Sequence, residues 1–313
     1  MATIAIIGPG AMGCLFSAFL ARAGHRVWLV DHRSERVAQL RSHDLIVESD
    51  SDTFQVAVEA TTNAYEVPPA ELVMVCVKAY ATSDVVPTAA VLAQMNGSVL
   101  TLQNGLGNLD ALAAQVSPTQ LLGGVTAQGA TLLGTGHVRH AGVGATAIGA
   151  RTEGGSDRAK RIAALLTEAG ISTEVTGSLD ETLWHKLVIN AAINPLGALL
   201  RVPNGTLVEH GESRSVMQAV TAEATTVASA RGIGLSAENA TALVEQVCRE
   251  TAGNLNSMLQ DVLRRRRTEI SAINGAIIRE GEQRDVPTTV NRLLVELVLA
   301  LEQTYQKQME CQC

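Results

Sequence analysis

Apolar residues near the start of the chain form two short runs, separated by a longer segment with the spacing of a helix. The runs cover residues 3–7 and 27–30, and the segment between them is rich in Ala, Leu and Phe and ends at Gly24. Short apolar runs bounded by turn residues are typical of buried strands, and glycine often follows the last turn of a helix. The pattern therefore predicts a strand, a helix and a second strand.

The same alternation continues to residue 175. Strands are predicted at residues 54–60, 72–77, 98–102 and 172–175, and helices at residues 34–41, 81–93 and 158–169. Between residues 122 and 150, alternating Gly, Thr and Val with many turn residues predict two or three antiparallel strands added to the sheet edge. Strands that alternate with helices in this way are typical of a doubly wound α/β domain.

Beyond Gly177-Ser178 the pattern is helical throughout, so we place a domain boundary there. The predicted fold class is α/β, with a Rossmann-type doubly wound sheet over residues 1–177 followed by an all-helical C-terminal domain over residues 178–313. A chain of 313 residues is long enough for two domains of ordinary size, each with its own buried core.

A glycine-rich turn, GPGAMG at residues 8–13, joins the first predicted strand to the first helix. In this context Gly8 allows a tight turn, Gly10 lets the backbone approach a pyrophosphate, and Gly13 lets the helix pack closely on the strand. The helix N-terminus adds free N–H groups and a partial positive charge. Asp31 follows the second strand about 20 residues later, as a ribose-binding acid does. The turn therefore predicts dinucleotide binding, with an ordinary glycine turn as the alternative.

The composition, 46% hydrophobic and 18% charged, is that of a globular protein. The net charge of −7 argues against a nucleic acid or an anionic membrane as partner. Five scattered cysteines suit a reducing cytosol better than a disulfide framework, and the last two, Cys311 and Cys313, either belong to a frayed tail or chelate a soft metal. No apolar run reaches the roughly 18–20 residues that span a bilayer, so we expect a cytoplasmic protein.

Five polar residues stand where ligands are often bound. Lys78 and Asn104 follow predicted strands, and ligands of doubly wound sheets lie beyond the carboxyl ends of the strands. A solvated lysine and an Asn-Gly turn are the alternatives. Lys186, Asn190 and Asn194 share one face of a predicted helix over about 12 Å, and a polar row on an apolar helix needs partners. A ligand is one such partner; otherwise Lys186 is exposed and Asn194 caps a helix that begins with proline.

A third informative segment covers residues 254–281. Ser257, Glu269 and Asn274 are polar residues in an otherwise helix-forming stretch. The basic run of residues 264–267 is typical of a solvated face, because the net charge disfavours a nucleic-acid partner.

Together, these stretches resemble the ketopantoate reductase (2-dehydropantoate 2-reductase) family over nearly the whole chain. The resemblance rests on GPGAMG at 8–13, VKAY at 77–80, QNGLGN at 103–108, LWHKLVINAAINPLGAL at 183–199 and SMLQDVLRRRRTEISAINGAI at 257–277. The last two motifs are much more selective than the first.

The resemblance implies hydride transfer from NAD(P)H to a branched 2-keto acid, with 2-dehydropantoate reduced to pantoate in pantothenate biosynthesis, and no metal. It makes Lys186 the catalytic acid, with Glu269 completing the site, and assigns substrate contacts to Asn190, Asn194 and Ser257. The residues expected to bind the cofactor are Gly8, Pro9, Gly10, Ala11, Met12, Gly13, Asp31, Arg33, Lys78 and Asn104.

Two departures from the family pattern bear on the site. Arg265 and Arg267 stand where the family often has glycine and proline, which predicts an altered loop. Asp31 stands where the family tends to carry a basic residue. A carboxylate there favours NAD because it repels a 2′-phosphate, whereas family habit favours NADP. His32, Arg33 and Lys78 would cradle that phosphate if the Asp31 side chain turned away.

Two rival functions stay open from the sequence. A 2-hydroxyacid dehydrogenase of the same family would share every catalytic residue and act on another keto acid. A non-catalytic dinucleotide-binding regulator is expected to lack the pair formed by Lys186 and Glu269, whose presence argues against it. The sequence also leaves the oligomeric state open, with a homodimer as one compatible assembly.

Overall fold

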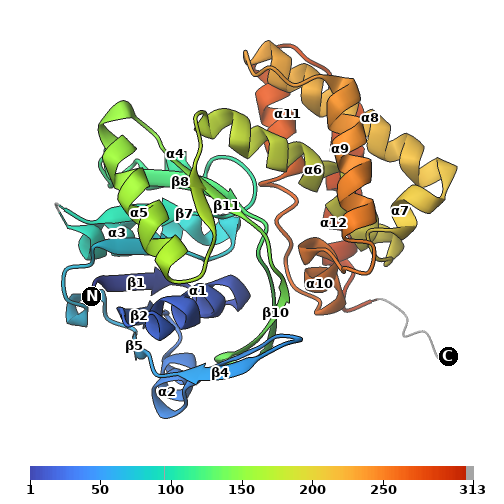
Figure 1. Ribbon diagram of the computed structural model, residues 1–313. Coiled ribbons are helices and arrows are strands. Elements are labelled where there is room, and N and C mark those ends of the chain that lie inside the picture. The colour runs from blue at the N-terminus through green and yellow to red at the C-terminus, as the bar shows by residue number, and fades with distance from the viewer. Residues whose placement is uncertain (95, 308–313) are drawn as a thin grey trace. The chain divides into compact units, whose positions relative to one another are not determined.

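The computed structural model describes residues 1–94 and 96–307 and divides the chain into two compact units (Figure 1). The first unit comprises Met1–Gln103 and Gly107–Thr182. The second comprises Asn104–Leu106 and the chain from Leu183 onward. Cys311 and Cys313 lie outside the described residues.

An eight-stranded sheet forms the centre of the first unit, in the order β12-β11-β8-β7-β6-β1-β2-β5. The six strands from β8 to β5 are mutually parallel, β11 is antiparallel to β8, and β12 is parallel to β11. The strands are β1 (Thr3–Ile7), β2 (Arg26–Val30), β5 (Glu59–Thr61), β6 (Leu72–Val75), β7 (Ser98–Thr101), β8 (Leu121–Thr126), β11 (Thr146–Ala150) and β12 (Thr173–Val175).

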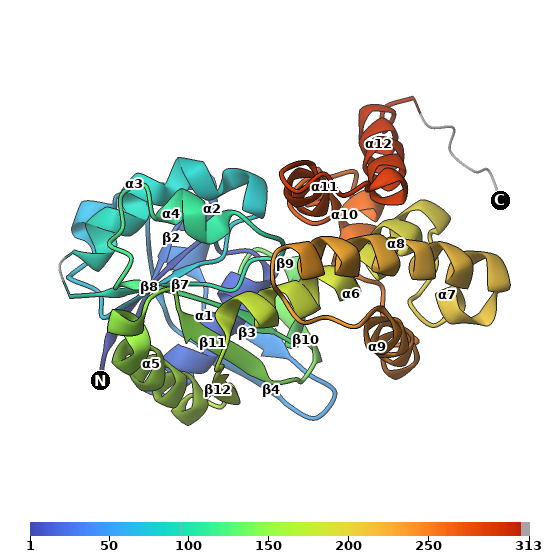
Figure 2. The same cartoon turned by 90° about the horizontal axis from the view of Figure 1, so that it is seen from above.

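Both faces of this sheet are covered by helices, as the continuous apolar strands require. In β1, Ile4 and Ile6 pack on one face with α1 (Ala11–Arg22) and α5 (Ser156–Glu168). Ala5 and Ile7 pack on the other face with α3 (Thr82–Ala93) and α4 (Asn108–Leu112). Figure 2 shows α3 and α4 on the side of the sheet opposite α5. The predicted doubly wound fold is confirmed; α2 (Ser34–Ser42) follows β2 as expected.

A second, four-stranded sheet in the first unit was not predicted. Its order is β4-β3-β10-β9, formed by β3 (Leu45–Glu48), β4 (Thr53–Val56), β9 (Gly129–Gly134) and β10 (His137–Gly142). The single strand predicted at residues 54–60 is wrong, because β4 pairs with β3 while β5 pairs with β2 in the large sheet. The prediction for residues 122–150 is also corrected: there are four strands, and two of them leave the large sheet to pair with each other.

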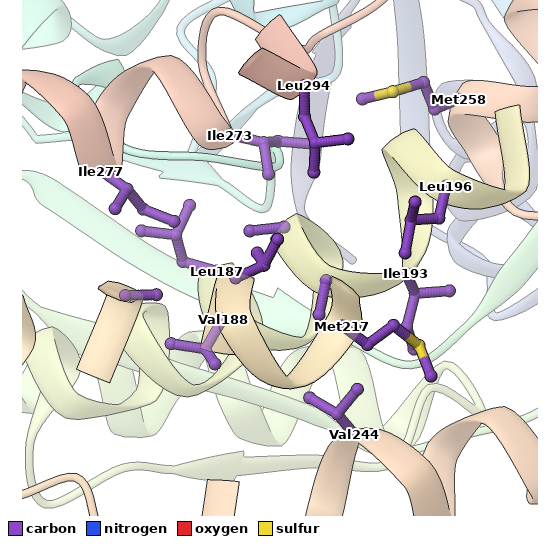
Figure 3. Packing of buried hydrophobic residues seen from close by; sticks show 14 of the residues in the cluster. Leu187, Val188, Ile193, Leu196, Met217, Val244, Met258, Ile273, Ile277 and Leu294 are labelled. Carbon is purple, nitrogen blue, oxygen red and sulfur yellow. The ribbon is translucent and has the colours of Figure 1, made fainter. Parts of the chain in front are cut away.

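The second unit is helical. Its helices are α6 (Leu179–Leu200, which starts in the first unit), α7 (Thr206–Glu209), α8 (Gly211–Ala230), α9 (Ala237–Glu250), α10 (Ser257–Leu263), α11 (Asn274–Glu282) and α12 (Thr289–Gln303). Figure 3 shows the core around α6, where Leu187, Val188 and Ile193 meet side chains from the surrounding helices. No helix in residues 1–94 and 96–307 is long and apolar enough to cross a membrane.

Helix α6 continues through Pro195, so the alternative in which Asn194 caps a new helix is wrong. Proline has no N–H, and the carbonyl of Ala191, four residues earlier, therefore loses its usual donor. The side chain of Asn274 replaces that donor, with its Nδ2 lying 3.0 Å from the Ala191 carbonyl oxygen. The same Nδ2 lies 3.0 Å from Oδ1 of Asn291. The unbroken helix keeps Lys186, Asn190 and Asn194 on one element.

Candidate functional site

The glycine-rich turn has the tight geometry that the sequence predicted. Gly8 has a φ of +94°, and a Cβ there would lie 2.7 Å from the side chain of Val77. A Cβ on Gly13 would overlap the carbonyl oxygen of Gly8. At Gly10, by contrast, a Cβ would meet nothing within 4 Å. The open backbone at Gly10, at the N-terminus of α1, therefore fits the pyrophosphate of a dinucleotide.

The glycine-rich turn, Asp31 and Lys78, all predicted to bind the cofactor, follow three neighbouring strands of the large sheet at their carboxyl ends. The glycine-rich turn follows β1, which is flanked by β2 on one side and β6 on the other. Asp31 follows β2, and Lys78 follows β6. After β5 the chain crosses to the other side of β1 and forms β6, so the strand order reverses at β1. Doubly wound sheets bind their ligands at such a switch point. The residues of the first unit therefore fit a dinucleotide.

The Asp31 carboxylate is buried and already engaged within the protein. Its Oδ1 accepts a hydrogen bond from the backbone N–H of Arg33 at 2.9 Å. Its Oδ2 accepts one from the Arg36 guanidinium at 2.7 Å. The sequence analysis missed Arg36, because a separation of five residues across a strand end and a helix start follows no helical or strand period.

Gln103 is a second residue that the sequence analysis missed. Its Nε2 donates to the carbonyl of Val77 at 2.7 Å and to the Thr82 hydroxyl at 2.8 Å. The Thr82 hydroxyl in turn donates to Oδ1 of Asn108. These bonds fix the segment after β6, which carries Lys78, against the end of β7. The sequence could have indicated this residue, because Gln103 is the first residue of the QNGLGN motif.

In the second unit, three segments bring polar side chains together. Nδ2 of Asn190 on α6 donates to Oδ1 of Asn104 at 3.2 Å. Nδ2 of Asn104 lies 3.4 Å from Oε2 of Glu269. Asn104, which the resemblance assigns to the cofactor, therefore belongs to the same unit as two residues assigned to catalysis and substrate.

Lys186 lies one helical turn before Asn190 on α6. It is partly buried, so the alternative of an exposed lysine does not hold. Burial lowers the pKa of Lys186 to about 8, from an ordinary value of 10.5. Glu269 is buried as well. The two predicted catalytic residues therefore have the restricted solvent access that strengthens electrostatic effects.

The remaining predicted substrate residues differ in their surroundings. Asn194 is buried on α6, one turn beyond Asn190. Ser257 is exposed as the first residue of α10, whose N-cap is Asn256.

The turn that carries Glu269 is held from α12. Oε1 of Glu302 accepts both the backbone N–H of Thr268, at 2.8 Å, and its hydroxyl, at 2.6 Å. Upstream, Arg265 adopts a φ of +52°, with the N–H of Arg266 bonded to the carbonyl of Asp261. This is the left-handed turn with which glycine usually ends a helix. The turn is thus formed despite the arginine, at the cost of a strained backbone.

Gly105 fixes Asn104 in place. The next residue, Leu106, donates its N–H to the carbonyl of Ala272 at 3.1 Å. Gly105 has a φ of +82°, and a Cβ there would overlap that same carbonyl oxygen. Only glycine therefore allows the segment Asn104–Leu106 to approach the chain beyond Glu269 so closely.

We expect Gly105→Ala to lower kcat/KM by at least tenfold, because the added methyl displaces Asn104 from Asn190 and Glu269. Gly107→Ala is the matched control, since Gly107 also has a positive φ, of +94°, but has nothing within 4 Å of an added Cβ. Steady-state kinetics and thermal unfolding of both variants make the comparison. Equal effects of the two substitutions would show that backbone strain, and not the position of Asn104, causes the loss.

Within residues 1–94 and 96–307, no group of three or more His, Cys, Asp or Glu side chains is arranged to hold a metal ion. The second unit offers amide, carboxylate and ammonium groups, and the first unit offers a glycine-rich turn.

Two family profiles cover most of the chain. The profile described as "Ketopantoate reductase PanE/ApbA" matches residues 4–153. The profile described as "Ketopantoate reductase PanE/ApbA C terminal" matches residues 178–302.

Individual proteins of known name are similar over nearly the full length. The 2-dehydropantoate 2-reductase of Halobacterium salinarum is 37% identical over 94% of this chain and 97% of its own. That of Vibrio cholerae is 32% identical over 97% and 99%. Among solved structures, a PanE/ApbA family ketopantoate reductase from Ralstonia eutropha JMP134 has a TM-score of 0.88 at 33% identity, covering 97% and 99%. A D-mandelate dehydrogenase with NADH and anilino(oxo)acetate has a TM-score of 0.91 at 29% identity, covering 96% and 98%.

Proposed function

Because the chain belongs to the ketopantoate reductase family, we propose that it reduces 2-dehydropantoate to pantoate with a nicotinamide dinucleotide. It is an oxidoreductase of 2-keto acids. The observation that carries the proposal is that Asn104 contacts both Glu269 and Asn190, and that Asn190 shares helix α6 with Lys186. In this proposal the predicted domain of residues 1–177 holds the dinucleotide, and the predicted helical domain of residues 178–313 binds substrate.

When bound, the dinucleotide supplies a hydride for the carbonyl carbon of the keto acid. Negative charge then grows on the carbonyl oxygen. The Lys186 ammonium stabilises that oxygen and donates the proton that completes the alcohol. With a pKa of about 8, roughly nine tenths of the Lys186 side chains carry this proton at pH 7.

Neutral polar groups orient the substrate in this proposal. Asn190 donates a hydrogen bond from its Nδ2 to Asn104, so its Oδ1 is the atom that can accept one from the substrate. The substrate's hydroxyl group is a donor that matches it. Asn194 and Ser257 add further neutral hydrogen-bonding groups, and Glu269 holds Asn104 in place.

The pKa of Lys186 predicts a pH dependence. Burial lowers this pKa to about 8, so the ammonium is lost as the pH rises through 8, well below the ordinary value of 10.5. We therefore expect kcat/KM for reduction to fall about tenfold per pH unit above pH 8 and to be level just below it. In Lys186→Arg the limb near pH 8 should vanish from any residual activity, because a guanidinium does not titrate there. A wild-type profile that stays level to pH 10 would contradict Lys186 as the acid.

A panel of keto acids tests the proposed substrate. The rival is a dehydrogenase of the same family with another substrate, as the D-mandelate dehydrogenase neighbour illustrates. It is not favoured, because relatives at up to 37% identity are named 2-dehydropantoate 2-reductases. We expect the highest kcat/KM with 2-dehydropantoate, over 2-ketoisovalerate and phenylglyoxylate. A higher value with phenylglyoxylate would favour the rival, and binding of a dinucleotide without turnover of any keto acid would favour the regulator.

For the cofactor, NADH is the preferred nicotinamide in our proposal. The support is the carboxylate of Asp31 at the end of β2, together with a structural neighbour that holds NADH.

The proposed location is the cytoplasm, since the described cysteines Cys14, Cys76 and Cys248 are free thiols.

A further inference from the structure

The carboxylate expected to exclude a 2′-phosphate is not an isolated charge. Both of its oxygens are bonded, and the Asp31 side chain is only 2% exposed. The Arg36 guanidinium lies 2.7 Å from Oδ2 and is 29% exposed. His32 lies 3.4 Å from Oδ1, with most of its ring in solvent.

These neighbours change the charge that an approaching phosphate would meet. An isolated carboxylate repels a 2′-phosphate, whereas a carboxylate in contact with a guanidinium forms a pair without net charge. The guanidinium is also the more exposed member of the pair, so an approaching phosphate can reach its N–H groups more easily than it can reach the carboxylate oxygens. A guanidinium near the adenosine ribose is what accommodates a 2′-phosphate in doubly wound folds.

We infer that Arg36 is a specificity-determining residue, which neutralises Asp31 and thereby weakens discrimination against NADPH. The inference rests on dinucleotide binding by the first unit. Asp31 favours NADH over NADPH, and Arg36 reduces the size of this preference. The two residues therefore act on cofactor selectivity in opposite directions.

The test is the ratio of dissociation constants, Kd for NADPH over Kd for NADH, measured by the fluorescence of the reduced nicotinamides without keto acid. In Arg36→Ala the ratio should rise by about 5- to 20-fold over the wild type, because the Asp31 charge is then uncompensated. Arg22→Ala is the matched control: it removes an arginine from the exposed pair Arg22–Asp52 of the same unit and should leave the ratio within twofold.

Asp31→Asn gives the second arm, since it keeps the shape of the side chain and removes its charge. The ratio should fall below that of the wild type, and adding Arg36→Ala to Asp31→Asn should not raise it above the wild-type value. Intact binding with a ratio unchanged in Arg36→Ala would overturn the role of Arg36 and leave the proposed function standing. A wild type that binds neither dinucleotide would overturn the inference together with the proposed function.

Discussion

Replacing Lys186 by alanine is expected to lower kcat by about 10²–10⁴-fold, the usual effect of removing a group that transfers a proton and stabilises a developing charge. The ammonium acts on the carbonyl oxygen mainly in the transition state, so KM for the keto acid should change much less. In the proposed function the dinucleotide is bound by residues of the first unit, so its Kd should stay within about twofold. Steady-state kinetics and nucleotide fluorescence measure the three quantities.

Lys160→Ala is the control for this variant, because Lys160 is an exposed lysine of α5 paired with Asp157. It should retain wild-type kcat. A near-normal kcat in Lys186→Ala would exclude Lys186 as the acid, whereas a loss confined to KM would make it a substrate-binding residue.

Asn274→Ala is expected to lower the free energy of unfolding by about 2–4 kcal/mol, a large effect for one side chain. Asn274 is fully buried, and its Nδ2 serves two acceptors, the carbonyl of Ala191 and Oδ1 of Asn291. Both would be left in the interior with fewer donors. Asn239→Ala, at an exposed position of α9, should change stability by less than about 0.5 kcal/mol.

Pro195 supplies the decisive second variant. In Pro195→Ala the new backbone N–H can donate to the Ala191 carbonyl, so this carbonyl no longer depends on Asn274. The loss caused by Asn274→Ala should therefore be smaller by about 1 kcal/mol in the Pro195→Ala background. Denaturant unfolding of the four proteins gives this coupling. Strictly additive effects would show that Asn274 does not compensate for the proline.

The sequence predicted the large sheet and most helices because their signals are local. The apolar run of β1, the glycine at the end of α1 and the continuous run of β6 each determine their element within a few residues. The second sheet escaped prediction, since pairing between β3 and β10 has no local signature. Phe54 and Ala60 lie in one alternating run, yet they belong to strands of different sheets.

The candidate site shows the same division. Helical spacing on α6 predicted that Lys186, Asn190 and Asn194 share a face, and the structure has them on one unbroken helix. The contact of Asn104 with Glu269 joins residues 165 positions apart, and only a fold can bring them together. The parts played by Asn274 and Arg36 were missed for a related reason. Asn274 matters because the Ala191 carbonyl has lost its helical donor, and Arg36 matters because the Asp31 carboxylate is buried. Neither circumstance can be read from the sequence.

The pairing of β3 with β10 has a consequence for how the nascent chain folds. Val47 of β3 lies opposite Val138 of β10, a strand made much later than β3. At about 5–20 residues per second, a ribosome needs roughly 4–18 s to make the residues between them. Throughout that interval the hairpin of β3 and β4 has an open edge and buried-type side chains without their cover. Slow stretches of translation over these residues would therefore prolong the period in which this strand edge is exposed in the nascent protein.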